Sequence, residues 1–233
     1  MKNKVVVIVT NLLICAIIVV TAVVGFAGGS AVTVSDGDNN VFYRSESKDG
    51  VSLMFNVYQG ADEVERILDI LDEYGAKATF FIGGCWADDN VDCVREISSR
   101  GHELASHGYF HRDHSALSYE ENVAEISPSV RLLEMISGQK IALFAPPSGA
   151  FCDYTVSACL ELGLKVIMWS RDTIDWRDSD AALIASRATK GLAAGDFVLM
   201  HPTSSTVQAL PVILNYIRNC GLAACTVSYS LGE

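Results

Sequence analysis

Short apolar runs alternate with amphipathic helical stretches along most of this chain, and this alternation constrains the fold more than any other feature. The predicted strands are residues 51–57, 78–82, 102–106, 141–145, 165–169, 197–201 and 222–227. The predicted helices are residues 62–74, 91–97, 118–137, 154–162, 181–192 and 207–218. Strands that alternate with helices favour a mainly parallel sheet. We therefore predict an α/β fold, a distorted TIM-like (β/α)7 barrel with one unit fewer than usual, or an open doubly wound sheet.

The first 30 residues are a separate segment. Lys2 and Lys4 precede a nearly unbroken apolar run at residues 5–27. A bilayer core takes about 20 apolar residues, whereas the apolar part of a cleavable signal usually has about 7–15. Residues 1–30 are therefore predicted to be an uncleaved transmembrane anchor, with a cleaved signal as the alternative. The lysines favour a cytoplasmic N-terminus, hence a single-pass protein of the cell membrane with an extracytoplasmic domain, or a secreted one after cleavage.

Residues 31–48 contain many polar turn formers and are predicted to be a linker before one folded domain, 49–233. Lys2 and Lys4 account for two of the 17 basic residues, so 15 remain against 28 acidic ones, a formal charge of −13. This acidity disfavours nucleic acid and anionic membrane surfaces as partners. It is compatible with a neutral or cationic ligand, such as a polysaccharide.

Six cysteines lie beyond the apolar run, and Cys15 lies within it. An even number in an exported domain permits disulfides, and small buried thiols are the alternative. The absence of a C-x-x-C pair argues against a cysteine zinc site.

Two histidines four positions apart, His107 and His111, follow the third predicted strand. Neutral imidazole is a good ligand for zinc and other divalent metals. Gly108 between them permits a sharp backbone turn that could aim both rings at one point. The pair is the best candidate metal site in the sequence, and two surface histidines on a loop are the alternative.

Other polar or aromatic residues fall at the ends of predicted strands, where α/β folds place their sites. Each has a structural explanation by itself, such as a Pro-Pro turn or a core tryptophan. Their joint position nevertheless predicts a functional site at one face. These residues are Asn56, Pro147, Ser148, Asp172, Asp175, Trp176 and His201.

The order of these motifs resembles that of the polysaccharide deacetylases of carbohydrate esterase family four, over residues 51–227. The matching segments are Ala78-Thr79-Phe80-Phe81, Gly101-His102-Glu103 with His107 and His111, Asp172-Thr173-Ile174-Asp175-Trp176, and Leu199-Met200-His201. The resemblance implies a hydrolase of carbon–nitrogen bonds other than peptide bonds. Its substrate would be an N-acetylated polysaccharide of the cell wall or a related glycan, and its cofactor a divalent metal, usually zinc.

The resemblance also implies roles for individual residues. His107 and His111 would hold the metal, and His201 would protonate the leaving amine. Asp172 or Asp175 would orient His201. A backbone N–H at Ser148 would help to hold the oxyanion. The expected substrate-binding residues are Pro147, Ser148, Trp176 and Tyr109, the last in a stacking platform with Phe110 and Trp86.

The first motif departs from the family. The family's base falls on Asn56, whose amide cannot take up a proton at neutral pH, and its metal-binding Asp falls on Val57, which has no ligand atom. The third motif's Arg and Tyr fall on Ala145 and Ser148. Either a nearby carboxylate replaces the base, or metal-bound water attacks without one, although zinc enzymes normally keep three protein ligands. The replacement carboxylates considered are Asp62, Glu63 and Asp113, and His114 is a spare ligand candidate.

Two functions therefore remain, of which the first, an active hydrolase, is the one that we expect and the second is the alternative. A metal-dependent deacetylase is favoured by the intact His107, His111, Asp175 and His201. A catalytically impaired, glycan-binding protein of the cell envelope is favoured by the altered first motif.

Overall fold

The structure is a computed structural model that describes residues 40–233. Its strands are β1 (Val41–Phe42), β2 (Gly50–Val57), β3 (Thr79–Ile82), β4 (Glu103–Ser106), β5 (Leu143–Phe144), β6 (Lys165–Ile167), β7 (Arg171–Asp172), β8 (Phe197–Met200) and β9 (Ala223–Cys225). Its α-helices are α2 (Ala61–Tyr74), α3 (Gly84–Asp89), α4 (Val91–Ser99), α5 (Tyr119–Ser137), α6 (Asp153–Glu161), α7 (Ala181–Thr189), α8 (Ser204–Asn219) and α9 (Val227–Leu231). Two 3-10 turns cover His114–Ala116 and Pro147–Gly149.

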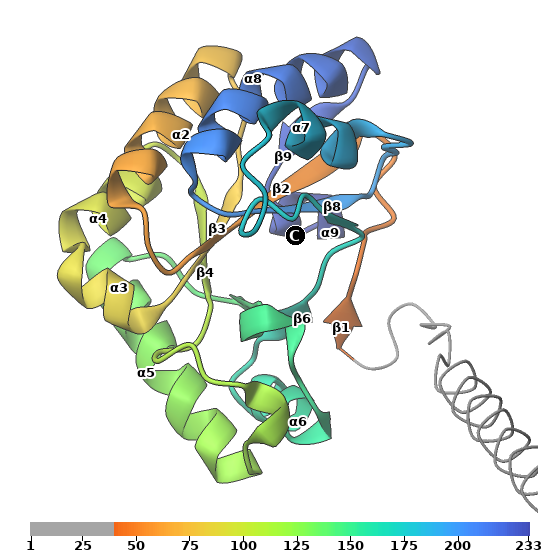
Figure 1. The fold of residues 1–233 in the computed structure, drawn as a ribbon. Coiled ribbons are helices and arrows are strands. Elements are labelled where there is room, and N and C mark those ends of the chain that lie inside the picture. The colour runs from red at the N-terminus through yellow and green to blue at the C-terminus, as the bar shows by residue number, and fades with distance from the viewer. Residues whose placement is uncertain (1–39) are drawn as a thin grey trace, which may run out of the picture. The chain divides into compact units, whose positions relative to one another are not determined.

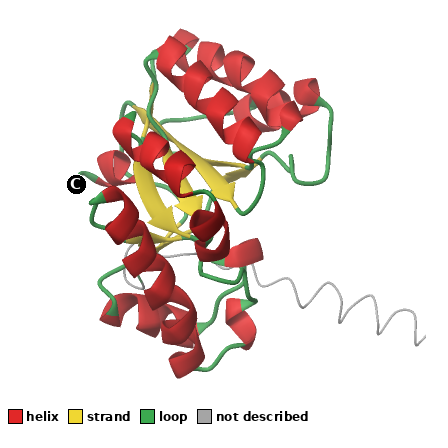
Figure 2. Cartoon of the chain, turned by 90° about the vertical axis from the view of Figure 1, so that its left-hand side faces the viewer, coloured by secondary structure: helices red, strands yellow, loops and turns green. Residues whose placement is uncertain are grey.

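The strands form one parallel sheet in the order β1-β6-β5-β4-β3-β2-β8-β7, with β9 paired to the start of β2. β6 pairs with β5, and β7, which follows three residues later, pairs with β8. The short connection from β6 to β7 therefore links two strands that lie near opposite ends of the sheet. The sheet is curled into a distorted barrel, with most helices outside (Figures 1 and 2). The predicted α/β fold with a curled, parallel sheet is confirmed.

β2 positions the site because it is buried along its whole length. Leu53, Phe55 and Val57 lie in the larger apolar cluster under the helices, and Met54 lies in the smaller cluster. Successive side chains of a strand point to opposite faces, so Asn56 shares the barrel-interior face with Met54. The strand's own alternation thus separates Asn56 from Val57.

Helix α9 packs against the amino ends of the strands. The backbone N–H of Val227 donates to Thr79 Oγ1 at 2.8 Å, and that of Ser228 donates to Glu103 Oε2 at 3.2 Å. Val227 also belongs to the smaller apolar cluster. This end of the barrel is therefore filled, and the carboxyl end is left for a site.

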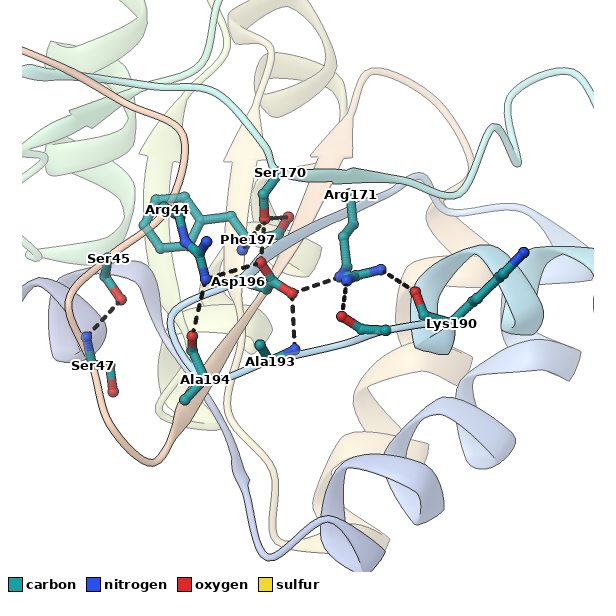
Figure 3. Close-up of polar contacts among 11 residues, drawn as sticks. Arg44, Ser45, Ser47, Ser170, Arg171, Lys190, Ala193, Ala194, Asp196 and Phe197 are labelled. Atoms are coloured by element: carbon teal, nitrogen blue, oxygen red, sulfur yellow. Dashed lines mark hydrogen bonds and ion pairs between the residues drawn. The ribbon is translucent and has the colours of Figure 1, made fainter. Parts of the chain in front are cut away.

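A second polar network holds the amino end of β8 (Figure 3). The buried carboxylate of Asp196 accepts hydrogen bonds from Arg171 Nε at 2.6 Å, Ser170 Oγ at 3.0 Å and the Ala193 N–H at 3.0 Å. Burial acts to raise the pKa of Asp196, but the hydrogen bonds from Arg171, Ala193 and Ser170 outweigh it and lower the pKa below its usual value. Arg44 Nη2 lies 3.6 Å from Asp196 and joins the segment after β1 to this network.

Several elements differ from the sequence prediction. β1 lies inside the segment predicted as a linker, 31–48, and the predicted strand 222–227 gives way to helix α9 at Val227. Thr226 caps α9 by accepting the Tyr229 N–H at 3.2 Å, and such a cap favours helix over strand. β7 and α3 were also not predicted.

The anchor or signal predicted at residues 1–30 lies outside the described residues, as do Cys15 and residues 31–39 of the linker. From residue 40 onward, no helix is long and apolar enough to cross a membrane. The cysteines that the structure describes are all unpaired: Cys85, Cys93, Cys152, Cys159, Cys220 and Cys225.

Candidate functional site

A cleft of about 530 Å³ opens at the carboxyl ends of the strands. Its walls come from the end of β2, the loops after β4, β5 and β7, and the residues after β8. Parallel strands bring these ends to one edge of the sheet. The predicted site residues that line the cleft are Asn56, His107, His111, Ser148, Asp172, Trp176 and His201. The other lining residues are Tyr58, Gln59, Trp169, Leu199, Pro202 and Thr203.

The two histidines after β4 lie together, with ring centroids 5.1 Å apart. Nδ1 of the buried His107 is 2.7 Å from the Ala145 carbonyl, which can only accept, so Nδ1 carries the proton and Nε2 is left as an acceptor. Burial, and next His111, lower the pKa of His107 to about 3. Burial also lowers the pKa of the half-buried His111. The neutral imidazoles turn inward because Gly108 and His111 have left-handed backbones, with φ of 75° and 55°.

These residues do not fit a resident divalent metal. Val57 is fully buried in the larger apolar cluster and offers no donor. Within residues 40–233, no group of three or more His, Cys, Asp or Glu side chains could hold a metal ion. His114, the spare ligand candidate, is itself buried, with its Nδ1 2.7 Å from Asn122 Oδ1. The donor set stops at His107 and His111, one short of the three protein ligands usual for zinc.

Asn56 stands where the resemblance places a catalytic base. Its side chain is only 4% exposed, and its Oδ1 is buried with no hydrogen-bond partner in the described chain. An unsatisfied buried acceptor costs about 1–3 kcal/mol. Asp62, Glu63 and Asp113, the candidate replacement carboxylates, do not line the cleft. The β2 wall therefore carries neither a base nor a metal-binding carboxylate.

The β8 wall, which consists of His201 and the loop after β7, by contrast has both the histidine and the carboxylate of the family pattern. Asp175 Oδ1 is 2.8 Å from His201 Nδ1, and Asp175 Oδ2 accepts from the His201 backbone N–H at 2.6 Å and from the Thr206 hydroxyl. The Asp175 side chain is fully buried. Asp175 is thus the carboxylate that orients His201, whereas Asp172 Oδ1 accepts the Ile174 N–H at 2.8 Å. No sequence pattern pointed to Thr206, which lies in the first turn of α8.

The loop between β7 and α7 has an unusual backbone. Ile174 has a φ of 56°, and a β-branched residue is rarely left-handed. Such a conformation costs about 1–3 kcal/mol and persists where its surroundings fix it. Here the Thr173 hydroxyl donates to the Leu199 carbonyl at 2.8 Å, and Arg187 Nη1 donates to the Thr173 carbonyl at 3.0 Å. The strained turn sends Asp172 to the cleft and Asp175 to His201.

Two predicted substrate-binding residues do not line the cleft. Pro147 is buried. The Tyr109 ring packs on Gly84, where a Cβ would lie 2.3 Å from it, and its hydroxyl bonds to Asp88. That hydrogen bond raises the pKa of Tyr109 to about 12. Trp86, expected at the cleft mouth, is also buried.

Aromatic residues from other positions line the cleft instead. The Tyr58 ring lies 4.6 Å from that of His111, and Trp169 follows β6. Their only sequence signal is an aromatic side chain near the end of a strand. Together with Trp176, which is 61% exposed, they give the cleft its flat apolar surfaces.

Comparison with known proteins gives concordant matches. The family described as polysaccharide deacetylase matches residues 43–167. The uncharacterized protein YlxY of Bacillus subtilis is 32% identical over 83% of this chain, which spans only 60% of its length. A peptidoglycan-N-acetylglucosamine deacetylase of Bacillus cereus is 31% identical over 70% of this chain and 79% of its own.

Among solved structures, a CE4 family pseudoenzyme from Bacillus anthracis superposes with a TM-score of 0.80 at 33% identity, covering 84% of this chain and 70% of that one. A mutant of that pseudoenzyme, described as having restored enzymatic activity, also gives a TM-score of 0.80, at 32% identity over 84% of this chain and 72% of that one.

Proposed function

This chain belongs to the polysaccharide deacetylase (CE4) family, and from that membership we propose that it binds an N-acetylated polysaccharide without removing the acetyl groups. The single observation that carries the proposal is the β2 wall of the cleft. There, Asn56 and Val57 stand at the two positions at which the family pattern has aspartates.

Hydrolysis of an acetamide needs an activated water, and the described cleft lacks the aspartate that the family pattern uses as the base. An amide such as Asn56 cannot accept a proton at neutral pH. Both oxygens of Asp175 are engaged by His201 and Thr206. Asp172, the one lining carboxylate, is on β7, two strands away from Asn56 on β2. The cleft therefore keeps His201, the expected general acid, but not the aspartate expected as the general base.

Binding is supported by features of the cleft that hydrolysis does not require. Tyr58, Trp169 and Trp176 offer ring faces on which sugars can stack. His107, which also lines the cleft, has an uncharged acceptor in its Nε2. Relatives named as peptidoglycan-N-acetylglucosamine deacetylases support this ligand class. A fold relative named as a pseudoenzyme supports the absence of hydrolysis.

The test is a calorimetric titration of the full chain, kept in mild detergent, with N-acetylglucosamine oligomers and peptidoglycan fragments. Acetate release is followed in the same samples, with and without added zinc or cobalt. We expect saturable binding and no acetate under any metal. Acetate release that disappears in His111→Ala would overturn the proposal.

A second candidate function, metal-dependent deacetylation, is supported by the complete Asp175–His201 pair. It requires zinc to bind with only His107 and His111 as protein ligands of the expected type. Isothermal titration with zinc, in parallel with His111→Ala, tests that requirement directly. Heat that is lost in the variant, together with acetate release, would favour this candidate.

We further propose that the protein acts at the outer face of the cell membrane, held there by residues 1–27. The apolar run after Lys2 and Lys4 supports this location. Protease added to intact cells should digest the domain from outside. Full protection, lost only on lysis, would contradict the proposed location.

A further inference from the structure

We infer that Asp172, with the indole rings of Trp169 and Trp176, forms a subsite for a protonated primary amine, so that the cleft prefers partly de-N-acetylated amino-sugar polymers. This inference rests on the proposed function, non-hydrolytic glycan binding, and names which form of the glycan is bound.

The first step is the charge of the cleft. Within the described chain, Asp172 is the only acidic residue that lines it, and neither Lys nor Arg does. Its Oδ1 accepts the Ile174 N–H at 2.8 Å, and its Oδ2 has no protein partner among residues 40–233. One oxygen of this half-buried carboxylate is therefore left without a hydrogen bond or a direct ion pair within the described chain.

The second step concerns two neighbouring arginines along the chain, Arg171 and Arg177, which hydrogen-bond to other carboxylates. Arg177 donates to both oxygens of Asp178, at 3.1 Å each, and stacks 5.8 Å from the Trp176 ring centre. Arg171 points to the far end of the sheet, where it binds Asp196 at 2.6 Å. Neither guanidinium hydrogen-bonds to Asp172, although Arg177 is near enough to interact with it electrostatically, so a cation from the ligand would form the first direct ion pair of this carboxylate.

The third step is the aromatic surface beside that charge. Trp169 is half-buried and packs on Gly149, whose missing Cβ would lie 2.9 Å from its ring. Trp176 is exposed. A cation placed over an indole face is stabilised by the ring quadrupole. A cleft lined by one carboxylate and two indoles thus suits an ammonium group better than a neutral acetamide, because acetylation removes the charge.

The fourth step is the distance between Asp172 and the strand that carries Asn56. Asp172 pairs in register with Leu199 on β8, and Leu199 pairs with Met54 on β2. Two strand spacings, about 10 Å, therefore separate Asp172 from β2, which carries Asn56. The amine subsite and the former base position can hold different groups of one ligand. The reaction that supplies the amine is amide hydrolysis, in which N-acetyl sugar and water give amino sugar and acetate, a step that the proposed function does not assign to this cleft.

The test compares calorimetric titrations of the full chain in detergent with two ligands: the N-acetylglucosamine tetramer, and a tetramer of the same length with some amines free. The buffer is mildly acidic, so that the free amines are protonated. We expect the amine-bearing tetramer to bind roughly tenfold more tightly, as for one charge-assisted contact. Asp172→Asn should reduce that ratio to about one.

Glu46→Gln is the matched control, because it removes one negative charge from an exposed side chain beside the far end of the sheet. It should leave the ratio unchanged. Trp176→Ala, at an exposed position that the core does not need, should lower the ratio even if Asp172→Asn unfolds.

Equal affinity of the wild type for both tetramers would overturn the inference. An equal loss of preference in Asp172→Asn and Glu46→Gln would also overturn it, since it would show general attraction to an acidic protein. Failure of the proposed function looks different: neither tetramer binds, or acetate is released. Absence of binding to both tetramers would overturn the amine subsite as well.

Discussion

The two walls of the cleft differ in how well their polar groups are paired. On the β8 wall, both oxygens of Asp175 have donors, from His201 and Thr206. On the β2 wall, Asn56 Oδ1 has no partner in the described chain, and Val57 is packed into apolar core. The fold thus tolerates the loss of the family's β2 carboxylates, because β2 is stabilised by burial rather than by its polar ends.

The intact wall has a structural reason to persist that is independent of catalysis. Asp175 accepts the backbone N–H of His201 and the hydroxyl of Thr206, so it ties its loop to β8 and to α8. Asp196 likewise joins separate segments at the opposite end of the sheet, where it accepts hydrogen bonds from Arg171 and Ala193 (Figure 3). The survival of His201 and Asp175 is therefore weaker support for activity than it appeared from the sequence.

The largest effect is expected from Val57→Asp, which puts an unpaired carboxylate into the apolar cluster. It should lower the free energy of unfolding by about 4–5 kcal/mol, measured by urea denaturation without metal. If the new carboxylate can turn to meet His107 and His111, zinc should restore much of that loss. The same substitution in His111→Ala is the control, and zinc should not rescue it. Unchanged stability would contradict the burial of Val57.

Asp175→Asn tests the other wall. The new amide brings N–H groups toward donors that need an acceptor, so we expect a loss of about 3 kcal/mol in urea denaturation. Asp172→Asn is matched in chemistry, but it keeps an oxygen for the Ile174 N–H. It should lose no more than about 0.5 kcal/mol. Equal losses in the two variants would mean that Asp175 is no more important for stability than Asp172.

Part of the pH dependence of stability should come from His102, a buried histidine outside both walls, in addition to the part that comes from His107. Burial, and next Lys77, lower the pKa of His102 from 6.5 to about 4. The unfolded chain therefore binds the proton first, and stability should fall by about 2 kcal/mol between about pH 6.5 and pH 5. His102→Asn keeps an acceptor for the Ala78 N–H, bonded at 3.3 Å, but does not titrate. Thermal melts should show a shallower fall, and an unchanged slope would exclude His102 as its source.

Periodicity and motif order were enough to predict the parallel sheet and the strand ends that meet at the cleft. They could not reveal β1 and β7, because neither of these two-residue strands lies in a longer apolar run, as the two-residue β5 does at residues 141–145. Thr206 was missed for a similar reason, since its role depends on Asp175, which is 31 residues earlier.

The direction in which a side chain points was the other feature that the sequence could not predict. Tyr109 follows His107 closely in sequence, yet its ring turns to Gly84 and Asp88. Asn56 and Val57 are adjacent, but strand alternation sends one to the barrel interior and the other to the helices. Only the three-dimensional structure shows that the two adjacent residues of this motif lie in different places, Asn56 at the cleft and Val57 in the apolar core.

The smallest effect, and the one opposite in sign, is expected from Asn56→Leu. Replacing a polar group that has no partner by an apolar side chain of similar volume should be neutral or should stabilise the fold by about 1 kcal/mol in urea denaturation. Asn122→Leu is the matched control, because Asn122 is equally buried but bonds to His114 and to the carbonyls of Leu117 and Ser118. It should destabilise by about 2–3 kcal/mol. Equal destabilisation by both changes would mean that Asn56 is paired, for instance through ordered water, and that the β2 wall is as well satisfied as the β8 wall.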